Sequence, residues 1–123
     1  MKKILAVLIL LLPTSLLADH LDVIPVTLQE DCSLGTYLAI AKDFNEQWGK
    51  ENGYIAEVAV PIQSDTLDRM FWLGRSANTA AFGAAYDKWI AESADPNTTA
   101  GKLWRRLQDC QEPLTARRGY LLH

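Results

Sequence analysis

The chain has 123 residues, of which 49% are hydrophobic and 22% are charged, and its 12 basic and 15 acidic side chains give a net charge of −3. This length suits one hydrophobic core. The densest basic spots are two adjacent pairs, Arg105-Arg106 and Arg117-Arg118, which do not make the continuous basic face of a nucleic-acid-binding protein. Two cysteines and two histidines are too few soft ligands for a closed zinc site, so we expect no metal.

The first residues have the order of a secretory signal peptide. Two lysines precede an apolar run over residues 4–12, and Ala18 offers a small residue for cleavage. The run is shorter than the ~20 residues of a membrane-spanning helix, so we expect no membrane association after cleavage. We predict a signal peptide at 1–18 and one mature domain at 19–123, exported to the periplasm or beyond the cell. Cleavage changes the net charge from −3 to −5.

The two cysteines, Cys32 and Cys110, both lie in the mature part. An exported chain meets an oxidising compartment, where such a pair closes into a disulfide. Closing a loop of this length stabilises a fold by about 4 to 5 kcal/mol in the chain-entropy model. A pair of free buried thiols is the alternative.

The first half of the mature chain predicts a strand, a helix and a hairpin. Residues 20–29 are rich in β-branched side chains and predict a strand that Pro25 restricts to a sheet edge or to a bulge. Ser33 is a suitable N-cap, and apolar residues at spacings of three and four predict a helix over residues 34–48, with its aromatic rings in the core. Residues 54–60 and 69–74 predict two further strands, joined across a polar turn.

The second half predicts two helices and a last strand. Asn78 is a suitable N-cap for a helix whose apolar face extends from Ala81 to Ile90. A short third helix follows over residues 103–110. Residues 114–122 then predict the last strand, in which Gly119 allows a bulge.

This order of elements predicts an α+β fold, the ferredoxin-like βαββαβ arrangement with helices on one face of an antiparallel sheet. The first and last strands are neighbours in that topology. Cys32 follows the first strand and Cys110 precedes the last, so their positions agree with it. Pro25 then falls in an interior strand, and a bulge is expected there.

Both faces of the predicted sheet are apolar. Along residues 54–60, Tyr54, Ala56 and Val58 point to one side, while Ile55 and Ala59 point to the other side together with Glu57. A sheet with one wet face alternates more cleanly between apolar and polar residues. Two slim helices cover one face, so the other face is expected to meet a partner surface.

The run Phe71-Trp72-Leu73-Gly74 leads into an alanine-rich helix over residues 80–85. Together with the element order and the two-faced apolar sheet, this run resembles the dimeric α+β barrel superfamily, which includes the antibiotic-biosynthesis monooxygenase-like proteins. The resemblance spans roughly residues 20–122. It implies a homodimer that pairs two sheet faces, and a small hydrophobic ligand between sheet and helices.

Some members of that superfamily oxidise aromatic compounds without a cofactor, and some degrade haem. The haem-degrading members resemble one another in a set of Asn, Trp and His. Asn78, Trp72 and His20 supply these residue types, but no helix of the mature chain contains a histidine to act as axial ligand. We therefore expect no haem and no other cofactor.

Two residues are candidates for proton transfer. Glu57 lies mid-strand among apolar neighbours, and an apolar cavity would raise the pKa of its carboxyl group. The alternatives are an ion pair with Arg117 or Arg118, or a solvated edge position. His20 is the second candidate, but it lies at the start of the mature chain, where fraying is expected.

Three further residues, Trp72, Tyr54 and Arg118, are candidates for lining a ligand pocket. Two hypotheses follow for function. The first is an exported small-molecule-binding or assembly module that performs no chemistry. The second is a cofactor-independent monooxygenase-like enzyme acting on a small hydrophobic or aromatic compound, with Glu57 or His20 as proton acceptor.

Overall fold

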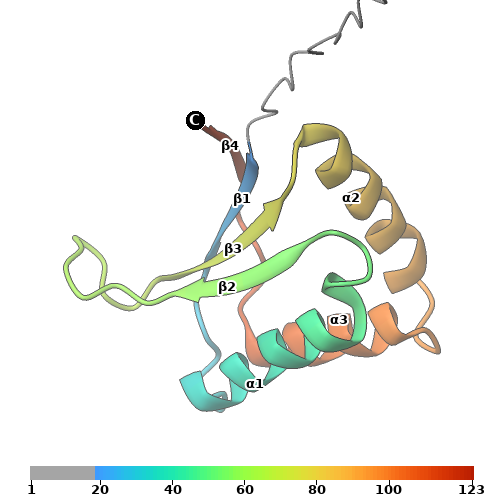
Figure 1. Ribbon diagram of the computed structural model, residues 1–123. Helices are drawn as coiled ribbons and strands as arrows, with labels where there is room; N and C mark the ends of the chain where they lie inside the picture. Colours follow the sequence, from blue (N-terminus) through green and yellow to red (C-terminus); the bar gives the residue numbers. More distant parts are fainter. Residues whose placement is uncertain (1–18) are drawn as a thin grey trace, which may run out of the picture.

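The computed structural model describes residues 19–123, so the signal peptide predicted at 1–18 lies outside the described residues. A four-stranded sheet carries helices on one face (Figure 1). The strands are β1 (Asp19–Val26), β2 (Ile55–Ala59), β3 (Met70–Ser76) and β4 (Arg118–Leu122). The helices are α1 (Leu34–Phe44), which continues into a π-helical turn η1 (Asn45–Gly49), α2 (Thr79–Ser93) and α3 (Thr99–Cys110).

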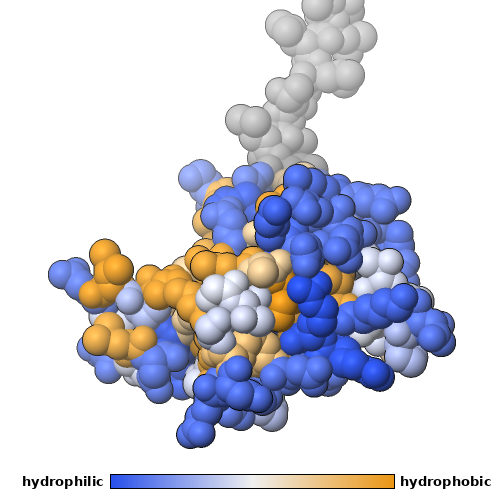
Figure 2. Space-filling view, turned by 90° about the horizontal axis from the view of Figure 1, so that it is seen from below, coloured by the Kyte–Doolittle hydropathy of each residue, from blue (hydrophilic) through white to orange (hydrophobic). Residues whose placement is uncertain are grey.

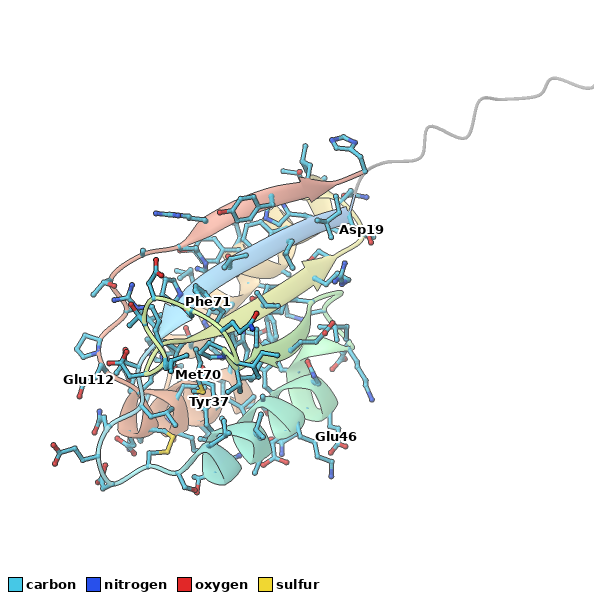
Figure 3. All side chains as sticks on the ribbon, turned by 90° about the vertical axis from the view of Figure 1, so that its left-hand side faces the viewer. Asp19, Tyr37, Glu46, Met70, Phe71 and Glu112 are labelled. Carbon is cyan, nitrogen blue, oxygen red and sulfur yellow. A yellow bond between two sulfur atoms is a disulfide. The ribbon has the colours of Figure 1, made fainter. Side chains whose placement is uncertain are left out.

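All three strand pairings are antiparallel, and the order across the sheet is β2-β3-β1-β4. Figure 3 views the sheet so that β4, β1, β3 and β2 follow one another from top to bottom. Since β1 and β3 occupy the centre and β2 and β4 the edges, this is the ferredoxin-like α+β arrangement. The predicted fold class is confirmed.

No bulge interrupts these strands, which corrects two expectations. Pro25 lies in the interior strand β1 and pairs in regular register with Phe71 of β3. The pairing of β1 with β4 ends at Val23. No carbonyl group of β4 therefore lies opposite Pro25, and the N–H group that proline lacks leaves no β4 acceptor without a donor. Gly119 also pairs regularly, and its role is steric, since a Cβ atom there would lie 3.0 Å from the ring of His20.

The first helix begins at the predicted cap and ends in a tighter contact with the sheet. Ser33 Oγ accepts a hydrogen bond from the backbone N–H of Thr36 at 3.1 Å. In η1, the side chain of Asn45 donates to the carbonyl of Ala56 at 2.8 Å and accepts from its N–H at 2.7 Å. This side-chain pairing with β2 holds the helix end against the sheet.

Two side-chain caps set the starts of the other helices. Asn78 Oδ1 accepts from the N–H of Ala81 at 2.8 Å, as predicted for α2. Thr98 Oγ1 accepts from the N–H of Gly101 at 2.9 Å, so α3 begins at Thr99 and is longer than the predicted helix over 103–110. Residues 94–100 contain several cap-forming side chains, which in the sequence indicate a break between helices.

The last strand is shorter than predicted, because β4 begins at Arg118 and not at residue 114. Residues 112–117 form an irregular, exposed segment between α3 and β4. Within it, Arg117 turns toward the helix-covered face of the sheet and contacts Asp22 of β1. That contact ends the strand on its N-terminal side.

The two cysteines meet as the topology predicts. Cys32 and Cys110 form a disulfide, with Cα atoms 5.1 Å apart, and the yellow sulfur bond is visible in Figure 3. Next to it, the N–H of Gln29 donates to the carbonyl of Cys110 at 2.9 Å. The disulfide therefore joins the end of α3 to the connection between β1 and α1.

Of the three helices within residues 19–123, two pack directly on the sheet. α1 packs on β2 and α2 packs on β3 and β1, whereas α3 packs mainly against α1 and α2. The core lies between the sheet and the helices, and Tyr37, Val26 and Leu103 are among its fully buried side chains. Because α3 stands off from the sheet, space remains between them.

The surface carries hydrophobic residues beyond the core. In Figure 2, which views the molecule from below, hydrophobic atoms gather at the centre of the view and on the left, where the β2–β3 connection lies. In that connection Ile62 is 93% exposed and Leu67 is 66% exposed. Among the helices of the described chain, none combines the length and the apolar character that crossing a bilayer requires.

Candidate functional site

A cavity of about 310 Å³ lies between the helix-covered face of the sheet and the helices α2 and α3. Aromatic rings from both layers supply much of its wall: Phe44, Trp72, Phe82, Tyr86, Trp89 and Trp104. Its volume falls at the lower end of the range of small-molecule sites, which are concave and mainly apolar with a few polar groups. The cavity is therefore the candidate binding site.

Small residues in α2 create this space. Ala85 is the one buried residue of α2, and it lines the cavity. A longer side chain at this position, directed at the sheet, would fill the volume that the methyl group leaves open. The alanine-rich sequence of α2 thus has a direct structural consequence, namely a cavity below the helix.

Edge-to-face contacts hold the aromatic wall in place. The ring of Phe44 lies 5.1 Å from that of Trp72 and 5.4 Å from that of Trp89, both at steep angles. Trp89 also meets Trp48 at 5.0 Å and Trp104 at 6.4 Å. Such aromatic pairs add to the stabilisation from buried area. The wall is therefore preorganised, because each ring is fixed by a neighbour.

An ion pair between a buried carboxylate and a partly exposed guanidinium forms the polar end of the cavity. Asp22 is only 1% exposed, and its carboxylate accepts hydrogen bonds from Arg117 Nε at 2.9 Å and from Arg117 Nη2 at 3.0 Å. Tyr54 Oη donates to the same carboxylate at 2.8 Å, and Trp72 Nε1 donates to Tyr54 Oη at 2.9 Å. The carboxylate is therefore paired and hydrogen-bonded, as a buried charge must be.

Gly74 gives Tyr54 the room to reach Asp22. Gly74 is paired with Asp22 across the sheet, and a Cβ atom there would overlap the phenol ring of Tyr54. The ring lies directly over the backbone of β3 and carries its hydroxyl to the carboxylate. The glycine in the strand is thus required by the close approach of a ring to the backbone.

Burial shifts the acid–base behaviour of this site. Burial raises the pKa of Tyr37 far above its usual value. Burial, reinforced by the negative charge of Asp22, does the same to the pKa of Tyr54. Burial alone would lower the pKa of Arg117, but the hydrogen bonds and charge of Asp22 outweigh it, so the pKa is raised. Both phenols stay neutral and the guanidinium stays charged.

The irregular segment over residues 112–117 closes one side of the cavity. Leu114 and Arg117 of this segment line it, and the guanidinium carbon of Arg117 lies 4.6 Å from the ring centre of Tyr86 in α2. A second, more open hollow of about 440 Å³ adjoins the first, and both are lined by Trp104, Gln111 and Leu114. The cavity thus borders a groove on the outer side of the segment.

The structure brings two of the three proposed lining residues to this cavity. Trp72 and Tyr54 line it. Arg118 is exposed on β4, opposite Val23, and is not part of the wall. The neighbouring Arg117 lines the cavity instead, because successive residues point to opposite sides and Arg117 turns inward to Asp22.

Glu57 lies on the other face of the sheet, away from the cavity. Its side chain is 62% exposed, and Oε1 lies 3.9 Å from Nε of Arg75 on the neighbouring strand. The ion-paired alternative is therefore the observed one, but the partner is Arg75 and not Arg117 or Arg118. Glu57 has neither the apolar surroundings nor the position that proton transfer in the cavity requires.

His20 is buried, which corrects the expectation of a frayed position. It pairs with Ser76 of β3 and Leu121 of β4, so strands flank it on both sides. Its ring stacks on Phe82 of α2 at 4.1 Å. His20 does not line the cavity, and among the described residues neither ring nitrogen has a hydrogen-bond partner.

Sequence reasoning missed Asp22 and Arg117. The sequence does contain a signal for Asp22, because residues 22, 24 and 26 share one side of the strand and the other two are the apolar Ile24 and Val26. A charge at such a position requires a buried partner of opposite charge.

No group of three residues among positions 19–123 has the side chains and spacing to hold a metal ion.

Comparison with known proteins finds solved structures that share the fold of this chain. No family model and no curated relative matches the sequence. A conserved protein from Methanosarcina mazei superimposes with a TM-score of 0.58 at 12% identity, over 87% of this chain and 95% of that one. A conserved protein of unknown function from Bacteroides thetaiotaomicron, described as a possible oxidoreductase, gives 0.54 at 13% identity, over 85% and 98%. A protein from Shewanella oneidensis gives 0.54 at 15% identity, over 85% and 90%. Identities this low show a shared fold alone.

Proposed function

We propose that this protein is a small-molecule-binding module whose cavity takes a compact, largely aromatic ligand. The observation that carries the proposal is the cavity wall of aromatic rings, with the guanidinium of Arg117 among its few polar groups. A preformed apolar cavity with a few placed polar groups is the usual form of a ligand site. An empty space of this size costs stability, which a bound ligand restores.

Binding is favoured over the oxygenase alternative by the chemistry of the wall. The described residues that line the cavity include no aspartate, glutamate or histidine. A cofactor-independent oxidation begins with removal of a proton, for which a base is needed. Glu57 lies on the opposite face of the sheet, and His20 lies outside the wall.

We also infer that the protein forms a homodimer through the helix-free face of the sheet. Leu21, Val23, Phe71 and Leu73 lie on that face, and each is partly exposed in the single chain. No helix covers this side in Figure 1. Burying such a face against its copy removes apolar area from water, which stabilises the pair.

A cavity-filling variant tests the binding function. We expect Ala85→Leu to weaken binding of the neutral fluorescent probe N-phenyl-1-naphthylamine by about tenfold or more, since each lost tenfold corresponds to about 1.4 kcal/mol of contacts. Ala84→Leu adds the same atoms to an exposed neighbour on α2 and serves as the matched control. Equal probe binding by both variants and the original protein would place the probe outside the cavity and contradict the proposal.

A charge on the helix-free face tests the dimer. Leu73→Arg should convert the dimer into a monomer in native mass spectrometry, because the guanidinium would be desolvated at the centre of the interface. Leu38→Arg makes the same change at an exposed leucine of α1, on the side of the helices, and should leave the mass unchanged. A monomeric mass for the unaltered mature protein would refute the dimer.

A further inference from the structure

We infer that the pair formed by Asp22 and Arg117 selects the chemical class of the ligand: an uncharged aromatic carbonyl compound, in preference to the corresponding carboxylate. This inference rests on the proposed binding function and adds to it the identity of the polar group that the ligand presents. It follows from three properties of the cavity, namely its free donors, its net charge and its rigidity.

Several free polar groups at the cavity act only as hydrogen-bond donors, whereas the hydroxyl groups of Ser93 and Tyr86, which also line it, can donate or accept. Arg117 uses Nε and Nη2 on Asp22, and within residues 19–123 its Nη1 has no hydrogen-bond partner. The indole N–H groups of Trp89 and Trp104 are likewise unpaired within the described chain. Arginine and tryptophan side chains donate and do not accept. A complementary ligand therefore presents an acceptor oxygen.

The acceptors of the polar end are already occupied. The carboxylate of Asp22 receives hydrogen bonds from Arg117 and from Tyr54, and the oxygen of Tyr54 receives one from Trp72. The amide oxygen of Gln111, also at the cavity, receives one from Tyr37 at 3.1 Å. A ligand that presents a donor, such as an amine, could pair with the hydroxyl groups of Ser93 and Tyr86 but not with the guanidinium of Arg117, which only donates.

The net charge of the polar end decides between a carbonyl and a carboxylate. Asp22 lies in direct contact with Arg117, so the pair carries no net charge. A carboxylate bound at Nη1 would bring a second negative charge close to the buried Asp22, in a region of low dielectric constant. A carbonyl oxygen accepts a hydrogen bond from the charged guanidinium without this repulsion.

The guanidinium is held in place on two sides, so it cannot move to suit a different ligand. Asp22 fixes one edge of Arg117, and the ring of Tyr86 lies against its face at 4.6 Å. These two contacts also fix the direction of the remaining edge of the guanidinium, which carries Nη1. The preference for a carbonyl over a carboxylate is therefore a property of the ligand-free protein.

Three probes of similar size test the inference in the unaltered protein: 2-acetylnaphthalene, 2-naphthoate and 2-ethylnaphthalene. We expect 2-acetylnaphthalene to bind about tenfold more tightly than 2-ethylnaphthalene, since a hydrogen bond to a charged donor is lost in the hydrocarbon. It should exceed 2-naphthoate by a similar factor at pH 7. Equilibrium dialysis of the mature protein gives all three dissociation constants directly and requires no variant.

Asp22→Asn gives the sharper test, because it removes the negative charge and leaves a hydrogen-bonding side chain beside Arg117. The order of the two oxygen-bearing probes should reverse, with 2-naphthoate now binding more tightly than 2-acetylnaphthalene. Near-ultraviolet circular dichroism reports whether the aromatic core of the variant is intact. Glu57→Gln removes a carboxylate from the opposite face of the sheet and should leave the order of the probes unchanged.

The outcomes separate this inference from the proposed function. Equal affinity for the three probes in the unaltered protein would overturn the inference and leave the binding cavity standing. A preference for 2-naphthoate in the unaltered protein would overturn it as well. Failure of all three probes to bind would overturn the proposed function together with the inference. The expected ranking with reversal in Asp22→Asn supports both.

Discussion

The two faces of the sheet carry ion pairs of the same chemical type, but the carboxylates of these pairs lie in opposite surroundings. On the helix-covered face, Arg117 meets the buried carboxylate of Asp22 at 2.9 Å. On the helix-free face, Arg75 lies 3.9 Å from both Asp19 and Glu57, and all three side chains are well exposed. The comparison teaches that burial, not the pairing itself, decides what an ion pair contributes to the fold.

The physical reason is the dielectric surroundings of each pair. Removing Arg117 would leave the carboxylate of Asp22 as an uncompensated charge in the core, which costs about 3 to 5 kcal/mol. An exposed pair at a similar separation is screened by water and contributes about 0 to 1 kcal/mol. The helix-covered face is therefore sensitive to single charge changes, and the helix-free face of the isolated chain is tolerant of them.

The largest expected effect compares the two faces directly. Arg117→Ala should lower the free energy of unfolding by about 4 kcal/mol, because the buried carboxylate of Asp22 loses its counter-charge. Glu57→Ala should change it by less than about 0.5 kcal/mol. Urea denaturation of both variants measures the difference. Similar losses in the two variants would break the comparison.

An intermediate effect is expected from the glycine below Tyr54. Gly74→Ala forces the phenol ring away from the strand, and we expect a loss of about 2 to 3 kcal/mol from overpacking. Gly83→Ala in α2 has no atom within 4 Å of the added methyl group and should stabilise the protein by about 1 kcal/mol, since alanine favours helix. Thermal unfolding of the two variants should thus shift in opposite directions.

The smallest expected effect is a dependence of stability on alkaline pH. The pKa of Tyr37 is raised by burial, so above about pH 10 the unfolded chain releases a proton that the folded chain retains. Stability is therefore complete below pH 10 and falls above it, by up to about 1.4 kcal/mol per pH unit for each such tyrosine. Tyr37→Phe should reduce this slope in denaturation curves between pH 9 and 11.5.

The control for that experiment lies on the other face. Tyr120 is 47% exposed on β4, and Tyr120→Phe should leave the alkaline slope unchanged. If both substitutions reduced the slope of stability against pH equally, burial of the phenol group would not be the cause of the alkaline effect.

Local sequence patterns predicted the secondary structure and the topology. Ser33 and Asn78 were identified as helix caps from residue type and position, and both cap in the structure. Apolar residues on both sides of the strands predicted a sheet with one uncovered apolar face. The positions of Cys32 and Cys110 agreed with the strand order before any contact was known. These features depend on neighbours within a few residues or on the order of elements, which a sequence contains.

Only the tertiary structure decided which side chains form the cavity. Asp22 and Arg117 are 95 positions apart, and nothing local distinguishes Arg117 from Arg118. Alternation along a strand separates its residues into two sets but does not say which set the helices cover, so it could not assign Glu57 to the open face. The depth of the cavity depends on how far α3 stands from the sheet. Pairing over such separations is selected by packing of the whole chain, because a buried charge is tolerated only where the fold supplies its partner.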